Sequence, residues 1–259
     1  MQDLKVTLVQ TEQFWKDKSA NLSNYDALLE QIESTDLILL PEMFHTGFCM
    51  DALELAESPT DSEGLSWLKH KAIQLNTAIY TSLIIEENSS FFNRGVFVFP
   101  TGEITCYDKF HLFSLAGEDQ IFSPGVERTI VSYNGWKIAL QICYDLRFPE
   151  LARNRIDEKG NPDYDVLLYV ANWPERRILH WDALLKARAI ENQSFVVAVN
   201  RVGNDGAGLR YNGSSAVYDA LGNTIIKATD FESKTVTCLL SSEDLYDVRT
   251  KIPFLKDQK

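Results

Sequence analysis

The chain has 259 residues, of which 45% are hydrophobic and 24% charged, and a formal net charge of −12. This composition is typical of a globular protein with a substantial core, and no linker or low-complexity tract interrupts it, so we expect one domain over residues 1–259. The negative charge argues against nucleic acid or an anionic membrane as a partner. Because residues 1–6 lack a signal-peptide pattern and no apolar run approaches the roughly 20 residues of a membrane helix, we expect a cytoplasmic location.

Strand and helix patterns alternate along the chain, which is typical of a layered α/β fold. Strands are predicted at residues 5–9, 37–40, 77–85, 95–99, 104–107, 136–142, 166–170, 195–200, 215–218, 224–227 and 235–240. Helices are predicted at residues 18–33, 62–75, 149–155, 177–192 and 242–249. In the fourth helix, Trp181, Leu184 and Leu185 recur at helical spacing and form an inward apolar face.

The two halves of the chain resemble each other. A buried strand that ends in polar residues occurs at residues 36–42 and again at 165–172, and a hairpin with a turn glycine occurs at 92–102 and at 211–222. Buried strands also resemble one another by chance. A genuine repeat predicts two units related by pseudo-twofold symmetry, with two sheets face to face and helices outside.

Four polar residues follow predicted strands, where ligands of open α/β sheets bind. They are Glu42, Lys109, Cys143 and Asn172. The remaining cysteines and the histidines are dispersed, without a C-x-x-C pair or metal-ligand spacing, so we expect no disulfide framework, no metal site and no cofactor. These residues are Cys49, Cys106 and Cys238, with His45, His70, His111 and His180.

Cys143 lies in the segment QICYDLRFPE, residues 141–150, after an apolar run and before Pro149, a residue tolerated at the start of a helix. A thiol on a strand-to-helix turn lies near backbone N–H groups and the positive ends of helix dipoles, which favour the nucleophilic thiolate. The alternative is a buried structural cysteine, which is the commoner case for a lone cysteine in an apolar stretch.

Two other segments carry candidate catalytic residues. Glu42 follows a buried run in LLPEMF, residues 39–44, and Lys109 ends a short strand in YDKFHLF, residues 107–113. Taken singly, Glu42 is also explained as a helix-start carboxylate and Lys109 as a solvated strand end. In this order along the chain, Glu42, Lys109 and Cys143 resemble the Glu-Lys-Cys triad of the carbon–nitrogen hydrolase (nitrilase) superfamily.

The resemblance covers nearly the whole chain. It continues through residues 117–118, 123–125, 171–174 and 188–192. The PEMF, DKFHLF and ICYDLRFPE segments are most similar to the ω-amidase branch. The resemblance implies a four-layer αββα sandwich and assembly into homodimers.

The resemblance also implies roles for the polar residues. Glu42 would take the thiol proton, protonate the leaving amine and then activate water. Lys109 would stabilise the thiolate and the oxyanion, together with the backbone N–H of Tyr144. Glu118 resembles the additional glutamate that positions the lysine; its alternative is a solvated loop acid.

His111 is the rival base. It lies two residues after Lys109, and in an extended segment this spacing places both side chains on the same face. A Cys–His hydrolase usually also needs an Asn or Asp to orient the imidazole, and we favour Glu42.

The candidates for binding the substrate are cationic or lie after the strand at 166–170. Arg147 follows the nucleophile by four residues, where related carbamoylases carry an arginine that grips the substrate carboxylate; a structural arginine is the alternative. The other candidates are Asn172, Trp173 as a pocket wall, Arg176 and Arg177. Arg188 and Glu191, three apart on a predicted helix, are expected to form a local ion pair of the scaffold.

The sequence therefore predicts a cofactor-free thiol amidohydrolase that releases ammonia from a small carboxamide, such as the ω-amide of 2-oxoglutaramate or 2-oxosuccinamate. A true nitrilase usually carries Trp-Glu after the cysteine, whereas this chain carries Tyr144 and Asp145. An N-carbamoyl amino acid amidohydrolase remains an alternative, because no residue distinguishes a carbamoyl from a carboxamide group. A catalytically silent interaction module with the same fold is the alternative from another class.

Overall fold

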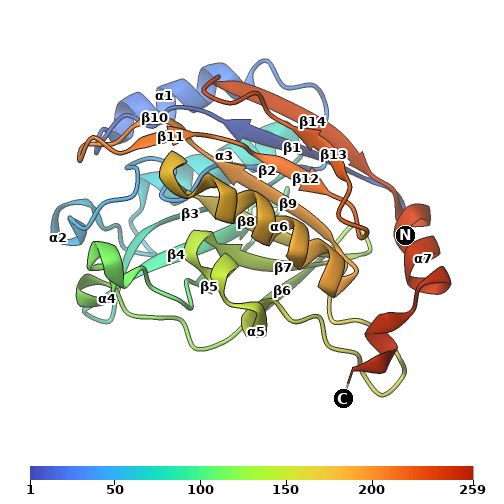
Figure 1. The fold of residues 1–259 in the computed structure, drawn as a ribbon. Helices are drawn as coiled ribbons and strands as arrows, with labels where there is room; N and C mark the ends of the chain where they lie inside the picture. Colours follow the sequence, from blue (N-terminus) through green and yellow to red (C-terminus); the bar gives the residue numbers. More distant parts are fainter. Residues whose placement is uncertain (259) are drawn as a thin grey trace.

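The computed structural model describes residues 1–258, which form two six-stranded sheets and a small two-stranded one (Figure 1). The first sheet has the order β14 (Lys234–Leu240), β1 (Leu4–Gln10), β2 (Leu37–Leu39), β3 (Ala78–Glu87), β4 (Ser90–Val98) and β5 (Ile104–Asp108). The second has the order β13 (Thr224–Lys227), β12 (Ala216–Tyr218), β9 (Phe195–Asn200), β8 (Val166–Ala171), β7 (Trp136–Ile142) and β6 (Thr129–Tyr133). The small sheet pairs β10 (Val202–Asn204) with β11 (Arg210–Asn212).

The central strands of both large sheets are parallel. Strands β2, β8 and β9 are nearly continuous apolar runs because both of their faces are buried. The register aligns Leu39 with Leu8 on one side and with Tyr80 on the other. Side chains of the two facing sheets form one core, across which the Tyr80 hydroxyl donates a hydrogen bond to the Gln141 carbonyl at 3.1 Å.

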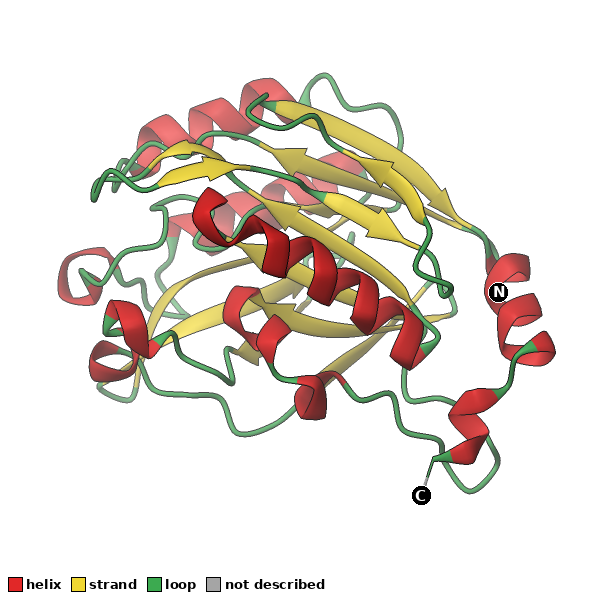
Figure 2. Ribbon diagram, in the orientation of Figure 1, coloured by secondary structure: helices red, strands yellow, loops and turns green. Residues whose placement is uncertain are grey.

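Helices cover the outer faces of the two sheets (Figure 2). On the first sheet, α1 (Lys18–Leu29) and α3 (Glu63–Leu75) pack through a second apolar cluster. Their starts are capped by the side chains of Asp17 and Ser62, which accept backbone N–H groups of the first turn. On the second sheet, α6 (Ile178–Asn192) packs through the buried residues Trp181, Leu185 and Ala189.

The remaining helices are short or peripheral. They are α2 (Ala52–Leu55), α4 (Glu118–Ile121), α5 (Pro149–Ala152) and α7 (Ser242–Lys251). With helices outside two facing sheets, the expectation of a four-layer αββα sandwich is confirmed.

The internal repeat is a property of the fold. The pairing β14-β1-β2-β3-β4-β5 matches β6-β7-β8-β9-β12-β13 in order, and each pair of neighbours has the same direction in both sheets. The repeated hairpins are β4–β5 and β12–β13, whose turns contain Gly102 and Gly222 with positive φ.

Several predicted bounds are wrong. Strand β6 was missed, although Asn134 and Gly135, both with positive φ, form the turn of the β6–β7 hairpin and are a strong hairpin signal. Strands β10 and β11 and helices α2 and α4 were also missed, and they are only three or four residues long. Helix α5 ends at Ala152 rather than at residue 155, because Asn154 turns its side chain to the backbone of Tyr164 and Asn192.

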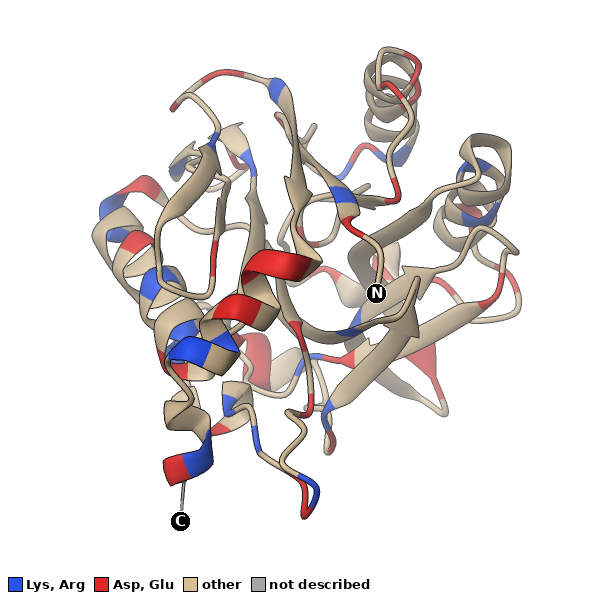
Figure 3. Cartoon of the chain, turned by 90° about the vertical axis from the view of Figure 1, so that its right-hand side faces the viewer, with Lys and Arg blue, Asp and Glu red and all other residues tan. Residues whose placement is uncertain are grey.

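Charged residues lie mainly on helices and loops, whereas the strands carry few (Figure 3). Within residues 1–258, no helix combines the length and the apolar composition needed to cross a bilayer.

Candidate active site

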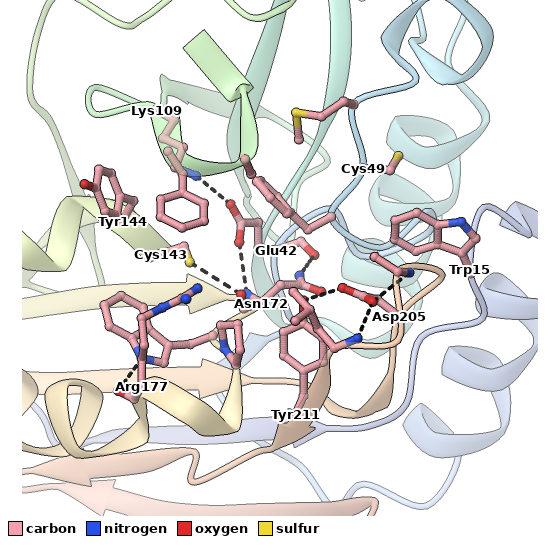
Figure 4. Close-up of a pocket in the computed structure, with 18 of the residues that line it drawn as sticks. Trp15, Glu42, Cys49, Lys109, Cys143, Tyr144, Asn172, Arg177, Asp205 and Tyr211 are labelled. Atoms are coloured by element: carbon pink, nitrogen blue, oxygen red, sulfur yellow. Dashed lines mark hydrogen bonds and ion pairs between the residues drawn. The ribbon is translucent and has the colours of Figure 1, made fainter. Parts of the chain in front are cut away.

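Four strands bring the four predicted polar residues together. Glu42 follows β2, Lys109 follows β5, Cys143 follows β7 and Asn172 follows β8, so each lies beyond the carboxyl end of its strand. All four line one cavity, as the sequence predicted (Figure 4).

Cys143 begins a short 3-10 turn, Cys143–Arg147, with φ of +43°, a strained value for a residue with a side chain. The turn is held by the buried carboxylate of Asp145, which accepts the Ile142 N–H at 3.0 Å and the Tyr107 hydroxyl at 2.7 Å. A second oxygen of Asp145 accepts the His111 N–H at 2.8 Å. Asp145 therefore ties the Cys143 turn to the segment that carries Lys109.

The Glu42 carboxylate is fully buried and each of its oxygens has a defined partner. Its Oε1 accepts hydrogen bonds from Lys109 Nζ and from Asn93 Nδ2, both at 2.9 Å. Its Oε2 accepts the backbone N–H of Asn172 at 2.9 Å. The Asn172 side chain donates to the Glu42 carbonyl at 2.6 Å, and the Asn172 carbonyl lies 3.9 Å from the Cys143 thiol.

Lys109 lies between two carboxylates. Its Nζ donates to both oxygens of Glu118 at 2.9 Å in addition to its contact with Glu42. Burial alone would lower the pKa of Lys109, but the charges of Glu118 and Glu42 outweigh burial and raise it, so the ammonium form is favoured. Glu118 is fully buried, which contradicts the alternative of a solvated loop acid.

The segment around Lys109 is also fixed by its backbone. The Gly125 N–H donates to the Lys109 carbonyl at 2.9 Å. A Cβ atom at Gly125 would lie 2.0 Å from the Asp108 carbonyl oxygen, so only glycine fits this approach.

The thiol itself differs from the expectation. Burial raises the pKa of Cys143 well above its ordinary value, and the charge of Glu42 and a hydrogen bond to Glu42 raise it further, while Lys109 lowers it. The turn was expected to favour the thiolate, but desolvation and the adjacent carboxylate outweigh the lysine. Burial and the nearby Glu42 therefore favour the protonated form of the Cys143 thiol.

His111 lies outside the lining of this cavity. Its ring stacks on Phe148 with 3.6 Å between centroids, and its Nδ1 lies 3.2 Å from Asp145 Oδ1. The Asp partner of a Cys–His site is thus present, but Asp145 also anchors the Cys143 turn, and His111 is not among the residues that line the cavity.

The cavity has a volume of about 260 Å³ and mostly apolar walls. Besides the four residues above, its lining comprises Trp15, Phe48, Cys49, Met50, Phe113, Ala116, Tyr144, Arg147, Trp173, Pro174, Arg177, Asp205, Ala207, Leu209 and Tyr211. The predicted residues Tyr144, Arg147, Trp173 and Arg177 therefore face it. Arg176 is exposed and is not among the residues that line the cavity, so the structure does not bring it together with the other candidates.

Arg147 and Arg177 are the two arginines of the cavity. The Arg147 guanidinium lies 4.6 Å from the Trp173 ring centroid, and that of Arg177 lies 5.2 Å from the Phe113 ring. Within the described chain, neither forms an ion pair with an acidic side chain. Burial lowers the pKa of Arg177, and the neighbouring charges of Arg176 and Arg147 lower it further, so an anion at this end of the cavity would relieve an excess of positive charge.

Comparison with known proteins places this geometry in a family. The model of the family described as "Carbon-nitrogen hydrolase" matches residues 5–250. The chain belongs to the carbon–nitrogen hydrolase family. It is therefore a hydrolase of non-peptide carbon–nitrogen bonds, as the sequence predicted.

Two relatives and one solved structure define the position within this family. The protein named omega-amidase YafV of Yersinia enterocolitica is 44% identical, over 99% of this chain and 97% of that protein. The 2-oxoglutaramate amidase of Bacillus subtilis is 32% identical, over 92% of this chain and 91% of that protein. The crystal structure of XC1258 from Xanthomonas campestris, a CN-hydrolase superfamily protein with an arsenic adduct in its active site, superposes with a TM-score of 0.97. It is 41% identical and covers 100% of this chain and 98% of that one. The expected superfamily and ω-amidase branch are confirmed.

Two supporting contacts of this site have no local signature in the sequence. Asn93 bridges Glu42 and Glu118, and no local pattern marks it. Arg188 forms the expected ion pair with Glu191 at 2.8 Å, but it also donates to the Leu146 carbonyl at 2.7 Å and so supports the Cys143 turn. Among residues 1–258, no group of three or more His, Cys, Asp or Glu side chains is placed to hold a metal ion.

Proposed function

We propose that this protein is an ω-amidase, which hydrolyses the ω-amide of a 2-oxo dicarboxylic acid such as 2-oxoglutaramate or 2-oxosuccinamate to the carboxylate and ammonia. The observation that carries the proposal is one cavity with a carboxylate–ammonium–thiol set and two arginines without acidic partners. The relatives named omega-amidase and 2-oxoglutaramate amidase support the same substrate class.

The first half of the reaction forms a thioester. Glu42 takes the proton of the Cys143 thiol while Sγ bonds to the amide carbon, and the carbonyl electron pair moves to oxygen. When Glu42 gains this proton it loses its charge, which frees a Lys109 N–H for the oxyanion, alongside the backbone N–H of Tyr144. The intermediate collapses as the carbon–nitrogen bond breaks, and Glu42 returns the proton to nitrogen, so ammonia leaves.

The second half hydrolyses the thioester. Glu42 takes a proton from water as the water oxygen attacks the acyl carbon of the thioester. The carbonyl electron pair moves again to oxygen and forms the second oxyanion. The carbon–sulfur bond then breaks, and the thiol of Cys143 is restored with the proton that Glu42 held. Glu118 holds Lys109 in place through both halves, because it accepts two of its hydrogen bonds.

Arg177 and Arg147 would bind the distal carboxylate of the substrate, since a guanidinium pairs with a carboxylate by two parallel hydrogen bonds. Trp173 forms the wall against which Arg147 lies. Asn172 acts mainly through its backbone, which contacts both Glu42 and Cys143.

We also propose that residues 1–259 act as a single catalytic domain, since the site draws on strands of both sheets. The protein is expected to work as a cytoplasmic homodimer. Sedimentation equilibrium tests the dimer, and a monomer at micromolar concentration would contradict it.

A panel of substrates tests the function. Ammonia release would be measured with dicarboxylic monoamides, their 2-oxo forms, neutral amides of equal length, nitriles and N-carbamoyl amino acids. The proposal expects the highest kcat/KM for a 2-oxo dicarboxylic monoamide. Preference for an N-carbamoyl amino acid would instead support the carbamoylase, and no turnover of any member would support the silent interaction module.

A further inference from the structure

A buried asparagine closes a ring of hydrogen bonds behind the triad. Asn93 lies on β4, is 1% exposed, and places its side-chain amide between two carboxylates. Its Nδ2 donates to Glu42 Oε1 at 2.9 Å and to Glu118 Oε1 at 3.1 Å. Lys109 Nζ donates to the same two oxygens, each at 2.9 Å. Both protons of the amide nitrogen are therefore used.

The orientation of this amide follows from its neighbours. The Asn93 Oδ1 atom is buried without a hydrogen-bond partner among the described residues. A flipped amide would instead point Oδ1 at the oxygens of Glu42 and Glu118, which repel it. The two carboxylates thus set the orientation, at the cost of one unsatisfied oxygen.

Asn93 also decides which oxygen of Glu42 is free. A carboxylate oxygen has about two lone-pair sites, and both sites of Oε1 are taken by Lys109 and Asn93. Oε2 accepts the Asn172 N–H, which leaves one of its sites for the thiol proton. We infer that Asn93 is a positioning residue of the reaction, which reserves Glu42 Oε2 for proton transfer and holds Glu42 and Glu118 apart around Lys109. This inference rests on the proposed amidase chemistry.

The charges around the ring give Asn93 a second effect. One ammonium, Lys109, faces two buried carboxylates of like charge, with the Cys143 thiol and the Tyr80 hydroxyl as the other titratable neighbours of Glu42. Asn93 donates to both carboxylates without adding charge, which favours their ionised forms. Without these two donors, Glu42 is expected to lose its fixed orientation, and the acid limb of the pH profile is expected to move to higher pH.

The test compares the parent with Asn93→Leu, which has a similar size and no donor. Asn93 does not line the cavity, so KM should stay within about three-fold while kcat falls about 10–100-fold, as expected for a lost hydrogen bond to a buried charge. The acid limb of the kcat/KM profile should move up by about one pH unit. Asn93→Ser, which keeps one donor, should lie between the parent and Asn93→Leu.

Asn154→Ser is the matched control, because Asn154 is a fully buried asparagine whose side chain bonds only to backbone groups of Tyr164 and Asn192, outside the site. It should lower thermal stability and leave the acid limb unchanged. Equal acid limbs and kcat values in the parent, Asn93→Leu and Asn93→Ser would overturn the inference. If the leucine variant does not fold, the serine variant decides alone.

A second readout separates this inference from the proposed function. Alkylation of Cys143 by iodoacetamide, followed by peptide mass across pH, needs no substrate. The acid limb of alkylation should also move to higher pH in Asn93→Leu, and superimposed profiles would contradict the inference. If the parent hydrolyses no ω-amide but the alkylation profile still shifts between the parent and Asn93→Leu, the ω-amidase assignment is refuted and the role of Asn93 is supported.

Discussion

Asn172 holds Glu42 by two hydrogen bonds, from its backbone N–H to Oε2 at 2.9 Å and from its side chain to the Glu42 carbonyl at 2.6 Å. Glu42 follows β2 of the first sheet and Asn172 follows β8, the matching strand of the second. The two halves of the pseudo-symmetric fold therefore meet at Glu42, the proposed general base. The Asn172 carbonyl lies beside the Cys143 thiol, so Asn172 contacts both the proposed base and the proposed nucleophile.

Glu42→Gln should lower kcat by about 10³-fold or more, because a buried amide cannot accept the thiol proton or activate water. His111→Ala should keep more activity, within about ten-fold of the parent, since its ring stacks on Phe148 outside the cavity. Steady-state ammonia release from both variants, with circular dichroism to confirm folding, measures this order. A His111→Ala protein less active than Glu42→Gln would favour the Cys–His mechanism.

Arg177→Ala and Arg147→Ala should each lower kcat/KM for dicarboxylic monoamides by about ten-fold or more, the value of one charge-assisted contact. A neutral amide of equal length should be affected much less. Arg176→Ala is the control, because Arg176 lies outside the cavity. This variant should leave kcat/KM unchanged for both the charged and the neutral amide. If Arg147→Ala and Arg177→Ala lose as much activity on neutral amides as on charged ones, the anion-binding role is refuted.

The stability of the protein should fall at alkaline pH. Burial raises the pKa of Cys238 to about 12 and also raises those of Tyr80 and Tyr107, so these groups keep their protons in the folded state. In the unfolded chain a cysteine loses its proton at about pH 8.5 and a tyrosine at about pH 10. Above those values the unfolded state binds fewer protons, and the free energy of unfolding decreases as pH rises.

Urea denaturation at pH 7 and pH 10 measures this decrease. Cys238→Ala removes one of the responsible groups, so its decrease between the two pH values should be smaller than that of the parent. Equal decreases would show that Cys238 does not contribute to the alkaline loss.

The sequence predicted that Glu42, Lys109 and Cys143 lie together, because each follows a strand within a family motif. Strands β8 and β9 are predicted from nearly continuous apolar runs, which are typical of buried parallel strands. The repeat also predicted that two similar sheets face each other. These features are local, or are copied within one chain, and can therefore be read from the sequence.

Other features depend on contacts between distant residues. Asn93 and Glu118 are 25 positions apart, and their hydrogen bond has no local signature. Arg176 and Arg177 are adjacent in sequence, yet of these two only Arg177 lines the cavity. Both lie in the 3-10 turn Glu175–Arg177, in which Arg176 is exposed. The protonated resting thiol likewise follows from burial, which the Cys143 motif alone does not reveal.

The central claim is that Cys143 forms an acyl-enzyme with the ω-amide. The direct measurement is acid quenching of the parent within its first turnovers on 2-oxoglutaramate, followed by intact and peptide mass spectrometry. The account predicts an adduct equal to the substrate minus ammonia on the Cys143 peptide, absent in Cys143→Ala, which should be folded and inactive. Cys106→Ala, altered at an exposed cysteine, should form the adduct normally. Rapid ammonia release by Cys143→Ala, or an adduct on Cys49 in its place, would contradict the account.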